Sequence, residues 1–137
     1  MNIRMTTVLA IALNTIPITH AQIYPSKALR IVLPFPPGGP TDLLGRQLAQ
    51  TVSVQMGQPV VAENRPGAGG NLGTEIATKA PADGYTLLLS SNILAISPHL
   101  YRKLPYDTVK DFAPITQVTQ VPNVLDRKST RLNSSHT

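Results

Sequence analysis

The sequence contains neither cysteine nor tryptophan, and only 4% of its residues are aromatic. A chain without cysteine forms no disulfide, has no thiol nucleophile and holds no thiolate-bound metal. It also offers no cysteine to which a lipid anchor could be attached. The lack of cysteine therefore excludes a disulfide-stapled scaffold and a cysteine-based active site.

Charge is also sparse, and the excess of basic residues comes from the two ends. The chain has 12 basic and 7 acidic residues, a net charge of +5. Residues 22–125 hold eight basic and six acidic residues, which leaves a net charge of +2. This excess is too small for a nucleic-acid footprint, and no basic cluster is interleaved with aromatic residues. Nucleic acid is therefore not expected as a partner.

Residues 1–21 have the pattern of a secretory signal peptide. Arg4 precedes a mostly apolar run from Met5 to Ile18, and Thr19 and Ala21 are small residues at −3 and −1 of a cut after Ala21. The run is too short for an ordinary membrane span. We expect export to the periplasm; the alternative is a buried N-terminal strand or helix.

Short apolar runs alternate with helical patterns along residues 22–125. Strands are predicted at 29–34, 59–62, 85–89 and 115–121, and helices at 41–56, 71–79 and 98–104, with a helical turn at 106–112. Short connections between alternating strands and helices predict an α/β fold with a mainly parallel sheet covered on both faces.

Local signals predict where the helices begin and which face they bury. Thr41 is expected to cap the first long helix, and Ser97 the last one, with Pro98 in its first turn. Apolar residues that recur every four positions predict the buried face of each of the first two helices. These faces are Leu44, Leu48, Val52 and Met56, and then Leu72, Ile76 and Ala80.

Two glycine-rich loops follow the first two strands and precede helices. In the first, the N–H groups of Gly38, Gly39, Thr41 and Asp42 are available to bind an anion. In the second loop, the N–H groups of Gly69, Gly70 and Asn71 are available to bind an anion in the same way. The spacing of the second loop departs from the dinucleotide fingerprint, and no acidic residue for a ribose follows at the expected distance. Both loops are also compatible with tight turns that need glycine for backbone reasons alone.

No catalytic constellation accompanies these loops. Ser90 and Ser91 lack the flanking glycines of a nucleophile elbow, and His99 is the only histidine within residues 22–125. The acidic residues of this span show no metal-ligand spacing. We therefore expect no enzyme, no cofactor and no metal. The alternative is an α/β enzyme that uses the glycine loops to bind a phosphate or nucleotide.

Residues 126–137 differ from the rest of the chain. They have no apolar periodicity, and they resemble one reading frame of a common sequencing-adapter oligonucleotide. We expect a non-native tail, with the genuine protein interrupted near Leu125; the alternative is a natural basic tail.

Five ordered motifs resemble the Bug family, the substrate-binding proteins of tripartite tricarboxylate transporters. The motifs are Tyr-Pro-Ser-Lys at 24–27, Ile-Val-Leu-Pro-Phe-Pro-Pro-Gly-Gly-Pro-Thr-Asp at 31–42, Val-Ala-Glu-Asn-Arg-Pro-Gly-Ala-Gly-Gly-Asn-Leu-Gly at 61–73, Ala-Pro-Ala-Asp-Gly-Tyr-Thr-Leu-Leu at 80–88 and Leu-Pro-Tyr-Asp-Thr-Val-Lys-Asp-Phe at 104–112. The resemblance implies a two-domain periplasmic flytrap receptor, roughly twice this length, in which residues 22–125 are an incomplete N-terminal domain.

The resemblance also implies what the receptor does. Such a receptor carries a small carboxylate, such as a di- or tricarboxylate or another organic anion, to the membrane components of the transporter. It is expected to be a monomer and to catalyse nothing. The residues expected to line this domain's side of the cleft are Phe35, Pro36, Gly38, Gly39, Thr41, Asp42, Ala68, Gly69, Gly70, Asn71, Ser90, Ser91 and Asn92.

Overall fold

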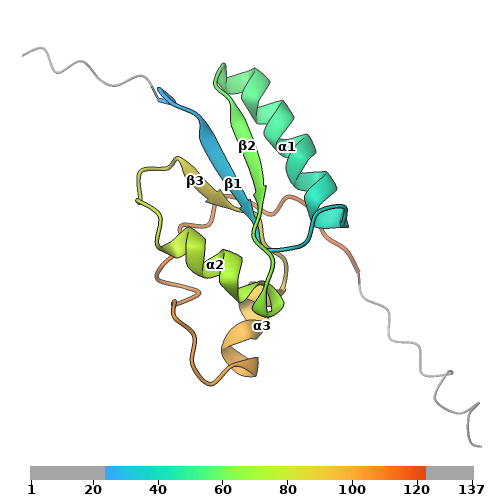
Figure 1. The fold of residues 1–137 in the computed structure, drawn as a ribbon, viewed down its shortest axis with the longest axis vertical. Coiled ribbons are helices and arrows are strands. Elements are labelled where there is room, and N and C mark those ends of the chain that lie inside the picture. Colours follow the sequence, from blue (N-terminus) through green and yellow to red (C-terminus); the bar gives the residue numbers. More distant parts are fainter. Residues whose placement is uncertain (1–23, 123–137) are drawn as a thin grey trace, which may run out of the picture.

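Three parallel strands form the centre of the molecule. The structure is a computed structural model that describes residues 24–122 (Figure 1). The strands are β1 (Leu29–Leu33), β2 (Val60–Asn64) and β3 (Thr86–Leu88), in the order β2-β1-β3. Both pairings are parallel, as predicted. The predicted signal peptide (1–21) and tail (126–137) lie outside the described residues.

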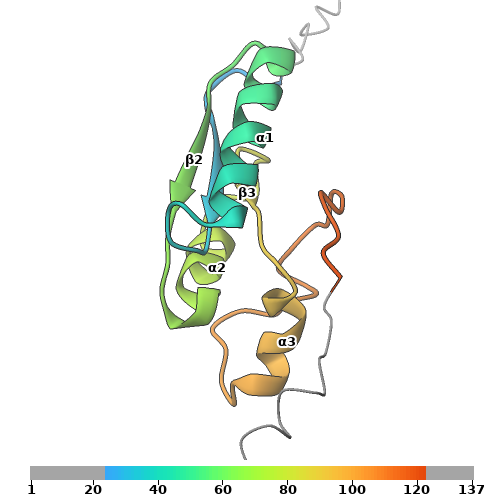
Figure 2. The same cartoon turned by 90° about the vertical axis from the view of Figure 1, so that its right-hand side faces the viewer.

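Helices flank this sheet and extend beyond its carboxyl end. They are α1 (Pro40–Met56), α2 (Asn71–Thr78) and α3 (Ile93–Leu100), with a short 3-10 turn, η1 (Ala68–Gly70), directly before α2. Helix α1 runs alongside the sheet and contacts β1 and β2. Helix α2 lies at the carboxyl ends of the strands, where it contacts β1 and β3, and α3 lies beyond them (Figures 1 and 2). The α/β class predicted from the sequence is confirmed.

Strand β1 is the core of the sheet because it is covered on all sides. Leu29, Ile31, Val32 and Leu33 are each no more than 2% exposed. An apolar run without alternation is what a strand between two neighbours and beneath a helix requires. The outer strands, β2 and β3, have mostly half-buried side chains.

Helix α1 approaches β1 through its smallest residues. A methyl group on Gly45 would lie 2.6 Å from a methyl carbon of Leu33, and Ala49 is buried beside it. The predicted apolar face is therefore displaced: its leucines and Val52 are half-buried on the flank, and Met56 is 42% exposed. The prediction missed this because apolar spacing does not identify a glycine as the point of closest approach.

The helix starts differ from the sequence prediction at two places. Gly39, not Thr41, is the N-cap of α1, because Pro40 lacks an N–H and its fixed φ suits the first helical position. Helix α3 begins at Ile93, so Ser97 and Pro98 lie inside it rather than at its start. Pro98 is near the helix end, where it removes a single backbone hydrogen bond.

The predicted burial of α2 is also wrong. Its buried residues are Asn71, Gly73 and Thr74, while Leu72 is 46% exposed. A methyl group on Gly73 would lie 2.6 Å from the Arg65 carbonyl oxygen and 2.8 Å from Pro34 Cα. The helix thus presses its backbone against two loops, and small or polar residues face inward.

The fourth strand predicted at 115–121 is absent from the described part of the chain. Residues 112–122 have no regular structure, and Ile115 and Val121 are 77% and 75% exposed. Alternating hydrophobicity favours an extended chain, but a strand also needs a hydrogen-bonding partner, and this segment pairs with neither edge of the sheet. The helical turn predicted at 106–112 is a single turn, in which the Asp107 carboxylate accepts the N–H groups of Val109 and Lys110 at 2.9 and 3.0 Å.

Within residues 24–122, no helix has both the length and the hydropathy needed to cross a membrane.

Candidate functional site

Three loops meet at the carboxyl edge of the sheet. Loop 1 (34–39) follows β1, loop 2 (65–70) follows β2 and loop 3 (89–92) follows β3. Gly70 of loop 2 lies against loop 1 and the start of α3: a Cβ on it would lie 3.6 Å from the carbonyl oxygen of Pro34 and 3.6 Å from a methyl carbon of Ile93, the residue after loop 3. After β1 the chain forms β2 on one side of β1, and it then crosses over to form β3 on the other side. The carboxyl ends of the strands at such a topological switch point are where open α/β sheets bind ligands.

Loop 1 is held by the carboxylate of Asp42. This side chain is 3% exposed and accepts three donors: the Gly38 N–H at 2.9 Å, Arg46 Nε at 3.1 Å and Asn64 Nδ2 at 2.9 Å. Asn64 also donates to the Phe35 carbonyl oxygen at 3.2 Å. Asp42 therefore ties loop 1 to the first turn of α1 and to the end of β2.

These donors set the charge state of Asp42. The hydrogen bond from Arg46, then those from Gly38 and Asn64, lower the pKa of the Asp42 carboxyl from 3.8 to about 2. The carboxylate therefore stays ionised to a lower pH than an ordinary aspartate, and both of its oxygens accept hydrogen bonds. The Asp42 side chain thus positions loop 1, while the predicted place of Asp42 at the ligand site rests on its backbone N–H.

The donors that loop 1 can offer a ligand are fewer than predicted. The Gly38 N–H is bonded to Asp42, and Gly38 itself adopts a φ of 84°. The N–H groups of Thr41 and Asp42 belong to the first turn of α1, where no intrahelical acceptor exists. Thr41 adds a hydroxyl. Loop 1 and the start of α1 line an open hollow of about 430 Å³, formed by Phe35, Pro36, Pro37, Gly38, Gly39, Pro40 and Thr41.

Loop 2 has an unusual backbone. Gly67, Ala68, Gly69 and Gly70 all have positive φ, and for Ala68 the value is 48°. A non-glycine residue in this region costs about 1–2 kcal/mol, which the surrounding contacts must offset. The Gly70 N–H donates to the Gly67 carbonyl oxygen at 2.9 Å, and the Asn71 N–H bonds to Ala68. Two of the three N–H donors predicted for this loop are therefore used within it, which leaves that of Gly69.

Loop 3 carries a hydroxyl that has no partner. Ser90 Oγ is buried, and among residues 24–122 it is the one buried side-chain oxygen or nitrogen without a hydrogen bond. Its neighbours are used locally: Ser91 Oγ accepts the Ile93 N–H at 3.4 Å, and the Asn92 carbonyl oxygen accepts N–H groups of α3 at 3.1 Å. Ser91 and Asn92 are exposed.

The site contains no free positive charge from its own loops. Arg65 is paired with Glu63, and Arg46 is paired with Asp42 at 3.0 Å. The remaining donors are neutral N–H and hydroxyl groups. Within residues 24–122 no three histidine, cysteine or acidic side chains come together as a metal site would require.

Sequence reasoning missed three residues that shape the site. Asn64 holds loop 1, while Ser97 and Tyr106 donate to the Asn71 side chain at 3.1 and 2.6 Å. Asn64 had a usable signal, because a polar residue ends an apolar strand there. The other two are distant in sequence from Asn71, and no local pattern identifies them.

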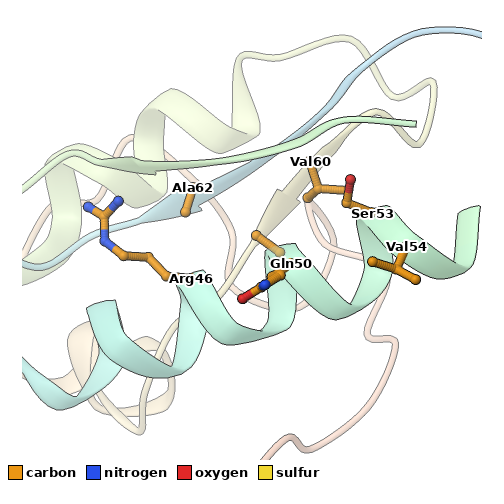
Figure 3. A pocket seen from close by; sticks show the side chains of 7 residues that line it. Arg46, Gln50, Ser53, Val54, Val60 and Ala62 are labelled. Carbon is orange, nitrogen blue, oxygen red and sulfur yellow. The ribbon is translucent and has the colours of Figure 1, made fainter. Parts of the chain in front are cut away.

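A second hollow lies away from the three loops. It is an open groove of about 360 Å³ between α1 and β2, lined by Arg46, Ala49, Gln50, Ser53, Val54, Val60 and Ala62 (Figure 3). None of the predicted site residues lines it. Its walls are mostly small or apolar, and Arg46 at one end also pairs with Asp42.

A sequence profile of the tripartite tricarboxylate transporter family receptor matches residues 44–130. The chain belongs to this receptor family. It is 48% identical over 107 residues to protein BugT of Bordetella pertussis, an alignment that covers 77% of this chain and 33% of BugT. The chain thus spans about a third of the length of the curated relatives it matches.

Solved structures of binding proteins share the receptor fold. The periplasmic binding protein BugD aligns with a TM-score of 0.65 at 40% identity, over 67% of this chain and 31% of BugD. A Rhodopseudomonas palustris protein solved with adipate aligns at 0.59 and 37% identity, over 62% of this chain and 29% of that one. MatC from the same organism, solved with malate, aligns at 0.58 and 35% identity, over 66% and 31%. The identification of the family from its motifs is confirmed.

Proposed function

We propose that residues 22–125 form part of the N-terminal domain of a periplasmic receptor that binds a small organic carboxylate. The receptor passes its ligand to the membrane components of a tripartite tricarboxylate transporter and catalyses no reaction. It works as a monomer after residues 1–21 direct its export, and it binds no nucleic acid. Family membership and the adipate and malate bound by similar proteins support this reading.

The observation that carries the proposal is the set of neutral donors at the carboxyl edge. Ser90 Oγ is buried without a partner, which costs about 1–3 kcal/mol unless a ligand or water bonds to it. Thr41 and the first turn of α1, which follow β1, supply further donors at the same edge of the sheet. Uncharged donors hold an anion through charge-assisted hydrogen bonds of about 1.5–3 kcal/mol each.

The absence of a free arginine on these loops suits a carrier. A fixed guanidinium would add a strong bidentate bond to each carboxylate, which slows release. Arg65 is engaged by Glu63, so we assign it to anchoring loop 2 rather than to the ligand.

The test measures thermal unfolding of the complete receptor that carries this sequence, with malate, adipate, succinate or citrate. Binding to the native state raises the melting temperature; a ligand at 100 times its Kd adds about 2.7 kcal/mol. Dimethyl malate, which lacks the charges, is the matched control and should give no shift. A shift with ATP or inorganic phosphate and none with the carboxylates would overturn the proposal in favour of the enzyme alternative.

A further inference from the structure

Two hydroxyl groups converge on one amide oxygen beside loop 2. Asn71 is 9% exposed, and its Oδ1 accepts the Tyr106 hydroxyl at 2.6 Å and the Ser97 hydroxyl at 3.1 Å. Both donors are buried, Ser97 at 1% and Tyr106 at 8% exposure. They come from α3 and from the segment after it, 26 and 35 residues along the chain from Asn71.

These two hydrogen bonds fix the orientation of the Asn71 carboxamide. A carboxamide has an acceptor oxygen at one end and two N–H donors at the other. Because both hydroxyls donate to Oδ1, the Nδ2 end is directed away from them. Among residues 24–122 no acceptor bonds to this Nδ2 group. Asn71 therefore keeps a pair of unused N–H donors at the junction of loop 2 and α2.

The backbone that carries Asn71 is fixed from the same side. Just after α3, the Tyr101 hydroxyl donates to the Ala68 carbonyl oxygen at 3.4 Å. The same hydroxyl would lie 2.8 Å from a Cβ on Gly69, whose φ of 64° itself favours glycine. The positive φ values of loop 2 are thus held in place by the segment that also orients the Asn71 side chain.

We propose that Ser97 and Tyr106 are positioning residues that aim the Nδ2 group of Asn71 at a carboxylate oxygen of the ligand. The inference rests on the proposed function, because it names the residues that orient one hydrogen-bond donor of the proposed ligand site. An amide held in this orientation selects for an acceptor, and it selects against a ligand that presents an N–H or ammonium group at the same point.

Asn71→Asp is the most informative variant. The new carboxylate still accepts both hydroxyl bonds, so the fold is kept, while the N–H donors are replaced by a negative charge. We expect the affinity for the carboxylate that stabilises most in the malate, adipate, succinate and citrate panel to fall about 100-fold or more. The melting temperature without ligand should change little.

Tyr106→Phe tests the positioning step separately, because it leaves Asn71 intact. We expect a fall in affinity of about 5- to 20-fold by calorimetry, since the amide is then held by Ser97 alone. Tyr85→Phe is the matched control: it removes a hydroxyl bonded to Ser26 at the opposite end of the sheet and should leave the affinity unchanged. A purely structural role for Tyr106 would lower the melting temperature of the free protein and leave the affinity of the folded fraction intact.

The outcomes separate the two proposals. If the unmodified receptor binds no carboxylate of the panel, the proposed function fails and this inference fails with it. If the unmodified receptor binds one, but Asn71→Asp or Tyr106→Phe binds it equally well, the positioning role is refuted and the receptor function stands.

Discussion

Replacing Gly73 with alanine tests whether loops 1 and 2 are locked together behind the site. Gly73 lies in α2, and its backbone is the surface against which both loops pack. A methyl group there would lie 2.6 Å from the Arg65 carbonyl oxygen and 2.8 Å from Pro34 Cα. Both contacts are to backbone atoms, so no flexible side chain can move aside to make room.

The sign of the stability change in Gly73→Ala distinguishes a closely packed helix position from an open one. In an open helix position alanine is favoured over glycine by about 1 kcal/mol. Contacts between non-bonded carbon atoms prefer about 3.5–4.0 Å, so the methyl group must push the loops apart by roughly 1 Å. Overpacking of this kind costs about 1–3 kcal/mol, and backbone contacts place Gly73→Ala at the upper end.

The assay is thermal unfolding of the complete receptor, followed by calorimetric titration with the carboxylate that binds it. For a receptor as long as its relatives, roughly 300 residues, each kcal/mol shifts the melting temperature by about 1.5 °C, so it should fall by roughly 4–5 °C. Affinity should also fall, by about tenfold, because the loops that carry the donors move apart.

Gly57→Ala is the matched control. Gly57 has a φ of 64°, and no atom lies within 4 Å of the position that a methyl group would take. Only backbone strain of about 1–2 kcal/mol is therefore expected, with no change in affinity. A melting temperature for Gly73→Ala that equals or exceeds that of the unmodified protein would refute the close packing of α2 on the two loops.

Two further predictions concern single polar groups. Ser90→Ala should leave the melting temperature unchanged or slightly raised, because the buried hydroxyl has no hydrogen-bond partner. The same variant should bind the ligand about 5- to 10-fold more weakly by calorimetry. An unchanged affinity would exclude Ser90 from the site. The pKa of Asp42 is lowered to about 2, so its stabilising contribution is fully present above about pH 4 and is lost as the pH falls through 2. Asp42→Asn should therefore lower the free energy of unfolding at pH 7. The difference in this free energy between the variant and the unmodified protein should shrink as the pH falls towards 2; a difference that stays constant with pH would contradict this.

The three strands of the sheet and the loops after them were predictable because their signals are local, unlike the strand wrongly predicted at 115–121. An unbroken apolar run such as Leu29–Leu33 indicates a buried central strand, and glycines directly after it indicate a loop before a helix. Parallel pairing then follows from the alternation of strands and helices. The sequence therefore placed loops 1, 2 and 3 at one edge of the sheet without knowledge of any contact between them.

The errors arose where tertiary contacts decide the outcome. Ser97 followed by proline is a strong capping signal, but its hydroxyl bonds to the distant Asn71 inside a longer helix. Gly38 was predicted to offer its N–H to an anion, yet the Asp42 carboxylate already accepts it. Periodicity could not show that α2 buries Gly73 rather than Leu72, because close backbone packing leaves no hydrophobic signature.

The most direct test of the proposed site is the position of a bound carboxylate in a crystal structure of the complete receptor. We expect a carboxylate group within hydrogen-bond distance of Ser90 Oγ, the Thr41 hydroxyl or N–H, and Asn71 Nδ2, at the carboxyl edge of the β2-β1-β3 sheet. A ligand bound in the groove between α1 and β2, or one that touches none of these three residues, would contradict the proposed site.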